Sequence, residues 1–390
     1  MKFDNINKLI LIEFFTNLFF YSPVIVFFYM SHDLNLFQIL SLEAWLAIAI
    51  AFSEIPTGII ADKFGRKLSV ILASICFITS LIILFFSTSY WMFVIQFLFF
   101  GTGLAFSSGC TEAMIYDSLK EKKKQHQMKK VIGMFVFASL IGFALANVCG
   151  SYIAHDLTVS GFRTVILLAI IGNIIGLLIS LTLGKSGESK SKEKSVKLFK
   201  DGLKLIYYNK SLQRIILLFI VSAPFIYVIQ YLYQPYLQNS GVPIALFGTI
   251  FAIAITLAAL AGKYIYKLEK KLGMKTAMLV ITLLPGFLYL GMSQIFSFGG
   301  AILLFITNRA VMGFRDPLFS DYQNQHIPSE NRATILSTIS LISSMYFIIM
   351  KLVIGYIADI SLSYAFMFIG GVIIFGSILL QINETHLCNE

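Results

Sequence analysis

The sequence predicts an all-α membrane protein with twelve transmembrane helices, arranged as two related six-helix bundles. Hydrophobic residues make up 57% of the 390-residue chain and charged residues only 13%, whereas soluble domains carry about 25% charged residues. The hydrophobic residues occur in runs of roughly twenty, the length at which a helix crosses a ~30 Å hydrocarbon core. These runs do not alternate between apolar and polar positions, so they predict helices rather than the strands of a barrel.

Twelve runs of this kind are expected to span the membrane: 7–30, 36–61, 68–87, 90–118, 130–153, 162–183, 212–237, 243–266, 274–294, 298–320, 332–357 and 361–382. Of the 30 Lys and Arg residues, 26 lie in segments on the same side as the N-terminus, and only Arg163 lies in a segment on the other side. Cytoplasmic loops collect Lys and Arg, so we expect both termini to be cytoplasmic. The net charge of +10 then reports orientation and does not indicate nucleic-acid binding.

The longest polar stretch between runs separates the first six from the last six. It predicts three parts: an N-terminal bundle at 1–184, a cytoplasmic linker at 185–211, and a C-terminal bundle at 212–390. Within the linker, apolar residues recur at helical spacing while lysines occupy the other positions. This pattern predicts an amphipathic helix at the membrane interface over 196–206.

Similar residues in the two halves also predict that one half arose by duplication of the other. A separation of 204 residues places the loop after the second run on the loop after the eighth, and the fourth run on the tenth. The aligned pairs are Gly58–Gly262, Asp62–Tyr266, Lys63–Lys267, Arg66–Lys270, Lys67–Lys271, Gly109–Gly313, Glu112–Asp316 and Asp117–Asp321. Parallel halves around a central site are a known transporter arrangement.

The segment "GIIADKFGRK", residues 58–67, resembles the signature between spans 2 and 3 of the major facilitator superfamily, G-x-x-x-D-[RK]-x-G-[RK]-[RK]. Every defined position matches: Gly58, Asp62, Lys63, Gly65, Arg66 and Lys67. With twelve runs and a central linker, the resemblance covers nearly the whole chain. It implies the fold of that superfamily and a secondary transporter that works by alternating access, similar to bacterial drug or metabolite exporters.

The resemblance also implies a cytoplasmic gate. Asp62 is expected to face the start of span 11, where free N–H groups favour an anion and Ser329 is a candidate cap. Arg66 is expected to pair with Asp117 at the inner end of span 4. Gly58 would allow close helix packing and Gly65 a tight turn. The alternative is that Lys63, Arg66 and Lys67 only set topology, as we expect for the second-half loop, where Tyr266 replaces the aspartate.

Several ionisable residues fall inside the predicted spans, where a charge costs roughly 2.5–3.5 kcal/mol on insertion scales. The candidates for proton coupling are Glu13, Glu54, Glu112 and Asp316. By family analogy, spans 1, 4, 7 and 10 line the central cavity. The candidates for substrate contact are Asn17, Gln96, Tyr227, Gln230, Tyr231, Arg309, Arg315 and Lys351. The alternative is that these charges neutralise one another, for example Arg315 with Glu112 or Asp316.

Two departures from the usual drug/proton antiporter pattern are present. Phe97 stands four residues before Gly101, where those proteins often carry an arginine, and the fifth run has no Gly-Pro pair. They bear on the coupling mechanism and leave the predicted fold unchanged.

The primary functional expectation is efflux by antiport, that is, proton-coupled export of a small amphipathic compound. The alternative is a proton symporter that takes up an anionic nutrient held by Arg309 and Lys351. A membrane enzyme or a non-transporting sensor is a third possibility, but no phosphate-binding loop, nucleophile motif or metal-ligand spacing supports it. We therefore expect no enzyme activity, no cofactor and no metal.

The expected partners are a small-molecule substrate, protons and the lipid bilayer, with no nucleic acid, and the family default is a monomer. The Lys-rich, Arg-poor and Ile-rich composition suggests a bacterial source. The expected location is therefore the bacterial cytoplasmic (inner) membrane, as a multi-pass protein.

Overall fold

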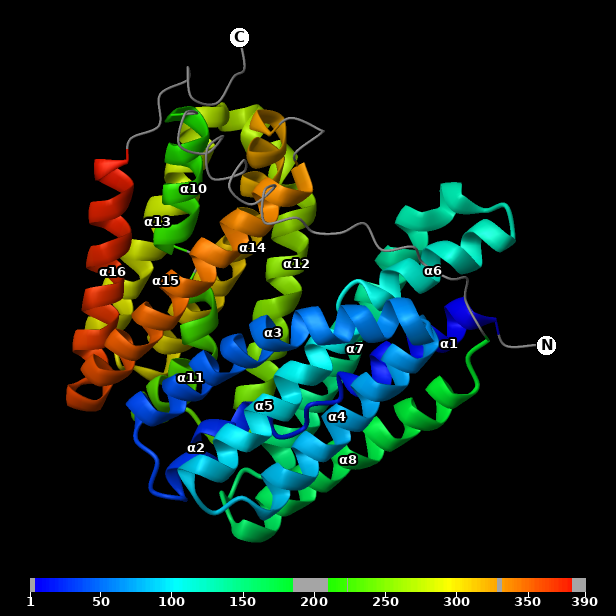
Figure 1. Ribbon diagram of the computed structural model, residues 1–390. Coiled ribbons are helices and arrows are strands. Elements are labelled where there is room, and N and C mark those ends of the chain that lie inside the picture. Colours follow the sequence, from blue (N-terminus) through cyan, green and yellow to red (C-terminus); the bar gives the residue numbers. More distant parts are fainter. Residues whose placement is uncertain (1–3, 185–209, 223, 328–331, 381–390) are drawn as a thin grey trace. The chain divides into compact units, whose positions relative to one another are not determined.

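The computed structural model describes residues 4–184, 210–222, 224–327 and 332–380 (Figure 1). The predicted linker helix at 196–206 and the candidate cap Ser329 lie outside them. The described residues form helices and no strand. The longer helices are α1 (Asn5–Thr16), α3 (Leu36–Phe64), α4 (Arg66–Phe86), α5 (Tyr90–Ser107), α6 (Cys110–Glu121), α7 (Met128–Ile153), α8 (Val159–Leu181), α10 (Lys210–Ser222), α11 (Pro224–Asn239), α12 (Phe247–Leu272), α13 (Met274–Gln294), α14 (Phe298–His326), α15 (Arg332–Ile360) and α16 (Leu362–Leu379).

Nine helical segments in the described part of the chain are long and apolar enough to cross a membrane. They coincide with nine of the twelve predicted runs, namely the second to sixth, eighth, ninth, eleventh and twelfth. The tenth run coincides with α14, a single helix of 29 residues. The first run is interrupted, and the seventh coincides with α10 and α11, which lie on either side of residue 223, outside the described residues.

The first run is interrupted after Thr16. After α1 ends at Thr16, the chain continues through a 3₁₀ turn at Ser22–Val24 into the short helix α2 (Ile25–Met30). Pro23 lies in the first turn of this 3₁₀ segment, a position where its missing N–H group costs no intrahelical hydrogen bond.

The fourth run is also interrupted, where we predicted one helix over 90–118. Gly109, between α5 and α6, adopts φ +69°, the left-handed conformation that favours glycine. The "SSGC" segment therefore ends one helix and begins the next within a single predicted span.

Glycines also mark the two corresponding loops, and they correct the predicted repeat register. Gly65 joins α3 to α4 with φ +89°, and Gly273 joins α12 to α13 with φ +76°. These turns are separated by 208 residues rather than 204, so the predicted alignment misplaced this loop by about one helical turn. The matching segments are "FGRK" and "LGMK", and the turn glycine rather than Gly58 fixes the register.

The chain forms two compact units. Unit 1 contains the described residues within 1–34, 42–192 and 243–249, and unit 2 contains those within 35–41, 193–242 and 250–390. The core of unit 1 joins α1, α4, α6 and α7 through buried side chains: Ile6, Leu9, Ile12, Val70, Met114, Ile115, Leu119, Val131 and Leu183. A core of unit 2 joins α10, α13 and α14: Ile215, Leu218, Met278, Ile281, Leu318, Phe319 and Tyr322.

Small residues let the interrupted first span lie against its neighbours in unit 1. A Cβ added at Gly142 of α7 would lie 2.6 Å from the Phe14 carbonyl oxygen. One added at Gly150 would lie 1.7 Å from that of Phe20. Any side chain at Gly150 would therefore collide with the backbone of the non-helical stretch.

Two short helix beginnings belong to a different unit from the rest of their helices. Residues 35–41, with the first turn of α3, belong to unit 2, and residues 243–249, with the first turn of α12, belong to unit 1. In unit 1, Ser151 donates a hydrogen bond to the carbonyl of Ala245 at 3.0 Å. We call these two segments the exchanged ends.

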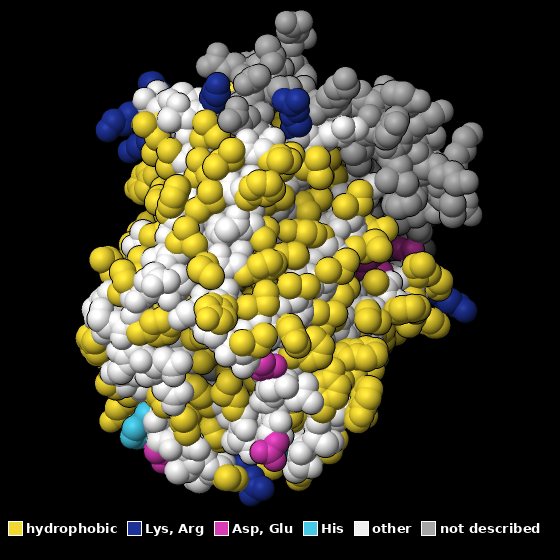
Figure 2. Space-filling model, turned by 90° about the vertical axis from the view of Figure 1, so that its left-hand side faces the viewer, with side chains coloured by type: hydrophobic (Ala, Val, Ile, Leu, Met, Phe, Trp, Pro, Cys, Tyr) yellow, Lys and Arg dark blue, Asp and Glu magenta, His cyan; other side chains and the backbone are white. Residues whose placement is uncertain are grey.

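The surface fits a lipid environment. Large apolar side chains are exposed along the long helices, among them Phe52, Phe86, Phe137 and Phe375 at 62–79% exposure. Figure 2 shows a face dominated by hydrophobic side chains, with Lys and Arg confined to its edges and several of them near the upper one. In water such a surface would be an aggregation hazard.

Candidate functional site

A cavity of about 180 Å³ lies within unit 1, between α1, α4, α5 and α6. Its polar lining consists of Glu13, Thr16, Asn17, Ser74, Ser107 and Thr111, and its apolar lining of Leu9, Ile12, Phe19, Val70, Ala73, Phe77, Phe100 and Leu104. Glu13 is the one charged residue in this lining. An apolar cavity with a few convergent polar groups is the usual form of a small-molecule site.

The end of α1 holds the Glu13 carboxylate in place. Asn17 donates from Nδ2 to Glu13 Oε1 at 3.0 Å and to the Glu13 carbonyl oxygen at 2.8 Å. Thr16 donates to the carbonyl of Ile12 at 2.8 Å. Both carbonyls lie near the end of α1, and the Glu13 carbonyl also accepts from the Asn17 N–H at 3.2 Å. The end of α1 therefore positions the Glu13 carboxylate beside the cavity.

The other predicted coupling acids lie elsewhere. Glu54 of α3 and Glu112 of α6 have exposed side chains, and neither is among the residues that line the cavity. Gln96, a predicted cavity residue, is buried and donates to Ser80 at 2.8 Å, which joins α5 to α4. The structure thus brings Glu13 and Asn17 together and leaves Glu54, Glu112 and Gln96 apart from them.

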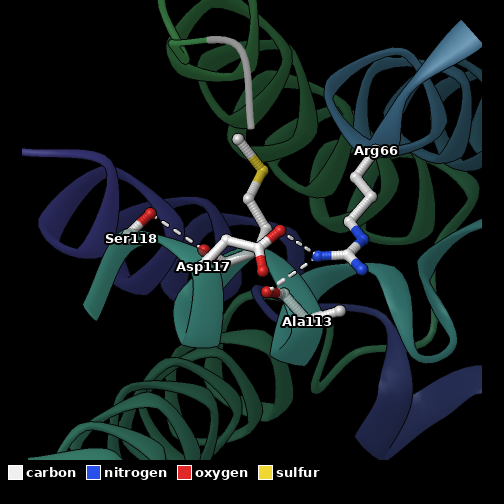
Figure 3. A network of polar contacts seen from close by, with 5 residues as sticks. Arg66, Ala113, Asp117 and Ser118 are labelled. Atoms are coloured by element: carbon white, nitrogen blue, oxygen red, sulfur yellow. Dashed lines mark hydrogen bonds and ion pairs between the residues drawn. The ribbon is translucent and has the colours of Figure 1, made fainter. Parts of the chain in front are cut away.

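The signature loop forms the turn between α3 and α4. Arg66, the first residue of α4, forms an ion pair with Asp117 of α6. The same guanidinium nitrogen donates to the Ala113 carbonyl at 3.1 Å. Figure 3 shows the Arg66 side chain reaching across to both acceptors. The pairing that the family resemblance implied is present in the structure.

The remaining signature residues are more open. Asp62 and Lys63 are exposed, and Lys67 is half-buried. Gly58 is exposed as well, and a Cβ added there would have no neighbour within 4 Å. The close helix approach expected at Gly58 is therefore not found among the described residues. Gly262, by contrast, packs against α14, since an added Cβ would lie 3.0 Å from the Gly313 carbonyl oxygen.

Unit 2 brings two predicted substrate-contact residues together. The Lys351 ammonium of α15 lies 5.7 Å from the ring centroid of Tyr227 on α11. Lys351 is buried and Tyr227 is exposed. Gln230 and Tyr231 follow on α11 and are half-buried.

The two arginines of α14 differ in their surroundings. The Arg309 guanidinium lies 5.5 Å from the ring centroid of Phe251 on α12. Arg315 is only 2% exposed and lies 4.2 Å and 5.2 Å from the ring centroids of Phe219 and Phe319. It also donates to the Phe219 carbonyl. These contacts favour a packing role for Arg315 between α14 and α10. The side chain of Asp316 lies outside what the structure describes.

Sequence reasoning missed Asn308, which precedes Arg309. Its side chain is fully buried, and neither its Nδ2 nor its Oδ1 has a hydrogen-bond partner among the described residues. An orphaned buried amide is costly, so it calls for an explanation such as a bound ligand or water. The available signal was a polar residue inside an apolar run.

Sequence reasoning also missed Asp359, at the end of α15. Its Oδ1 accepts a hydrogen bond from the Leu36 N–H at 2.6 Å, and its Oδ2 one from the Phe37 N–H at 3.1 Å. The signal was present in the sequence, because "GYIAD" at 355–359 repeats the "GIIAD" of 58–62.

Known protein families were compared with the chain. The family model of the Major Facilitator Superfamily matches residues 9–345. The chain belongs to the Major Facilitator Superfamily. It is similar to the uncharacterised MFS-type transporter YxaM of Bacillus subtilis (strain 168), at 23% identity over 358 residues that cover 87% of this chain and 85% of YxaM.

Solved structures of the superfamily share the fold. The nucleoside transporter NupG aligns over 100% of both chains with a TM-score of 0.80 at 13% identity. A D-xylose–proton symporter aligns over 98% of this chain and 99% of its own, with a TM-score of 0.72 at 15% identity. The protein is therefore a multi-pass secondary transporter of the superfamily that acts on a small-molecule substrate.

Proposed function

We propose that this transporter exports a small amphipathic compound in exchange for protons, and that Glu13 carries the proton. The observation that carries the proposal is that Glu13 is the one charged residue lining the cavity of unit 1, beside Asn17 and four hydroxyl side chains. A carboxyl group inside a membrane bundle marks a proton or substrate pathway more often than a structural site.

Proton and substrate would use this site in turn. In exchange, the substrate would occupy the cavity while Glu13 is ionised and held by Asn17, and Glu13 would take up a proton only after the substrate has left. The transmembrane potential would supply the driving force, at about 2.3 kcal/mol for each charge moved across 100 mV. The bundles 1–184 and 212–390 would rock around the site as a monomer.

The orientation and the gate complete the proposal. We place the chain in the bacterial cytoplasmic membrane with both termini inside, which is where the Lys and Arg count puts them. Asp62, Lys63 and Lys67 would then lie at the inner entrance. The Arg66–Asp117 ion pair would hold the α3–α4 turn in the shape that lets Asp62 reach the start of span 11.

A second candidate function is uptake of an anionic nutrient by proton symport. Lys351 beside Tyr227 and Arg309 beside Phe251 offer cationic groups with an aromatic wall. Similarity in fold to a D-xylose–proton symporter is consistent with this direction of coupling.

Reconstituted vesicles with an imposed pH gradient distinguish the two. We would measure gradient-driven flux of ethidium, as an amphipathic probe, and of a sugar phosphate, as an anionic probe. Exchange predicts that substrate entering inside-out vesicles releases protons from them, whereas symport predicts substrate and protons moving together. A Glu13→Gln variant that keeps full pH-driven flux would rule out Glu13 as the coupling group. Glu121→Gln, at the exposed end of α6, is the matched control.

A further inference from the structure

The first turn of α3 has all of its leading N–H groups satisfied, from two different sources. Asn35 and Gln38 form a reciprocal capping box, in which Gln38 N–H donates to Asn35 Oδ1 at 2.9 Å and Asn35 N–H to Gln38 Oε1 at 3.1 Å. The remaining two donors, of Leu36 and Phe37, go to the two oxygens of Asp359. A helix start favours an anion, because its first N–H groups have no partner within the helix and the helix dipole is positive at this end.

The packing around Asp359 brings its carboxylate within reach. Gly355 lies one helical turn earlier on the same face of α15. A Cβ added at Gly355 would lie 2.8 Å from the Phe37 Cα and 3.3 Å from the Leu36 carbonyl oxygen. The glycine therefore lets the two backbones approach, and the aspartate binds the donors that this approach presents.

The same five-residue pattern stands near the other end of α3. Gly58 and Asp62 close α3 as "GIIAD", and Gly355 and Asp359 close α15 as "GYIAD". The two copies differ in their described surroundings. Asp359 holds two helix-start donors and Gly355 is packed, whereas Asp62 is exposed and Gly58 has open space around it.

We propose that Asp359 is a latch, that is, a contact that holds the outer end of α3 against α15. This latch would alternate with the cytoplasmic gate at Asp62. With Asp359 engaged, the first turn of α3 is held against α15 within unit 2, and this state would correspond to a closed outer entrance. When Asp359 releases, Leu36 and Phe37 turn their N–H groups to water, and the outer end of α3 leaves α15. The assignment of outer and inner ends rests on the proposed function.

Spin-label distances at the outer loops test this directly. The labels are placed at Thr88, before α5, and Ser297, before α14, which are both exposed, in a background with the four native cysteines replaced by serine. The full chain is measured in lipid nanodiscs without substrate. Asp359→Ala should raise the population of longer distances about tenfold, the ratio that corresponds to about 1.4 kcal/mol.

Variants separate the latch from general damage. Asp359→Asn keeps the side-chain shape and should give a smaller shift in the same direction, and Gly355→Val should match Asp359→Ala. Asp156→Asn is the matched control, since Asp156 accepts from Thr158 within its own loop at 3.3 Å and should cause no shift. Unchanged distances in monodisperse Asp359→Ala and Asp359→Asn proteins would overturn the proposal. Absence of transport in the vesicle assay would sink the proposed function and leave these distances interpretable.

Discussion

Arg66 and Asp117 form an ion pair that joins the first turn of α4 to α6, although 50 residues separate them in the chain. Both side chains are largely shielded, at 17% and 23% exposure. The same arginine nitrogen also donates to the Ala113 carbonyl. Two acceptors on α6 therefore hold the Arg66 side chain, and with it the turn between α3 and α4.

The first prediction concerns the strength of this pair. Removing one partner leaves the other shielded and unpaired, so Asp117→Ala should destabilise the fold by about 2 kcal/mol, less than a fully buried pair would lose. In an Arg66→Ala background the same substitution should cost about 1 kcal/mol less. Denaturant titration of the four proteins in detergent measures this coupling. Additive effects would mean that the pair contributes nothing to stability.

The second prediction concerns Glu13. Its replacement by Gln keeps the shape and the contact with Asn17 and removes the titrating proton. The substrate accumulation driven by a pH gradient should therefore collapse, while counterflow exchange with no gradient continues. Asn17→Ala should weaken the positioning of the carboxylate and give an intermediate loss. Both fluxes lost together in Glu13→Gln would instead indicate a direct role in binding substrate.

The third prediction concerns the glycines of α7. A methyl group at Gly150 would lie 1.7 Å from the Phe20 carbonyl oxygen, while Gly133 on the same helix has open space around it. Gly150→Ala should cost more than about 3 kcal/mol, in the range of severe steric defects. Gly133→Ala should stabilise by about 0.5–1 kcal/mol, the usual gain of Ala over Gly in a helix. Thermal unfolding of the two variants makes the comparison, and equal midpoints would contradict the packing described.

The fourth prediction concerns Asn308. Leu has a similar shape and no polar atoms, so Asn308→Leu should raise stability by about 1 kcal/mol, because it removes an orphaned amide. The same change should lower the transport rate if the amide meets the substrate. Asn147, on α7, also has an Oδ1 with no partner in the described chain, but its Nδ2 donates to the Phe143 carbonyl at 2.8 Å. Asn147→Leu should therefore lower stability, and a stabilised variant would contradict this reasoning.

Much of the fold could be read from hydropathy, because a membrane span needs about twenty apolar residues and little else. The breaks in the spans required more than hydropathy. No proline stands at Thr16, where the first break begins. Gly109, at the second break, is one of 27 glycines, and its positive φ distinguishes it. The predicted repeat register misplaced the loop for a related reason, since the alignment matched Gly58 and left out the turn glycine Gly65.

The site was predictable where local sequence decides the geometry. Glu13 and Asn17 lie four residues apart at the end of one helix, and Arg66 belongs to a recognised signature. Contacts between distant segments could not be predicted in this way. The pairing of Asp359 with residues 36 and 37 depends on how α15 meets α3. The burial of Asn308 depends on the packing of the whole helix α14.

The exchanged ends carry a consequence for the integrity of the chain. Each unit includes one short segment, 35–41 or 243–249, whose helix continues in the other unit. A cut in the chain within residues 185–209 would leave α3 and α12, the two helices that carry the exchanged ends, intact. The two fragments, synthesised separately in one cell, should therefore assemble by trading these segments and purify together on a tag carried by either one.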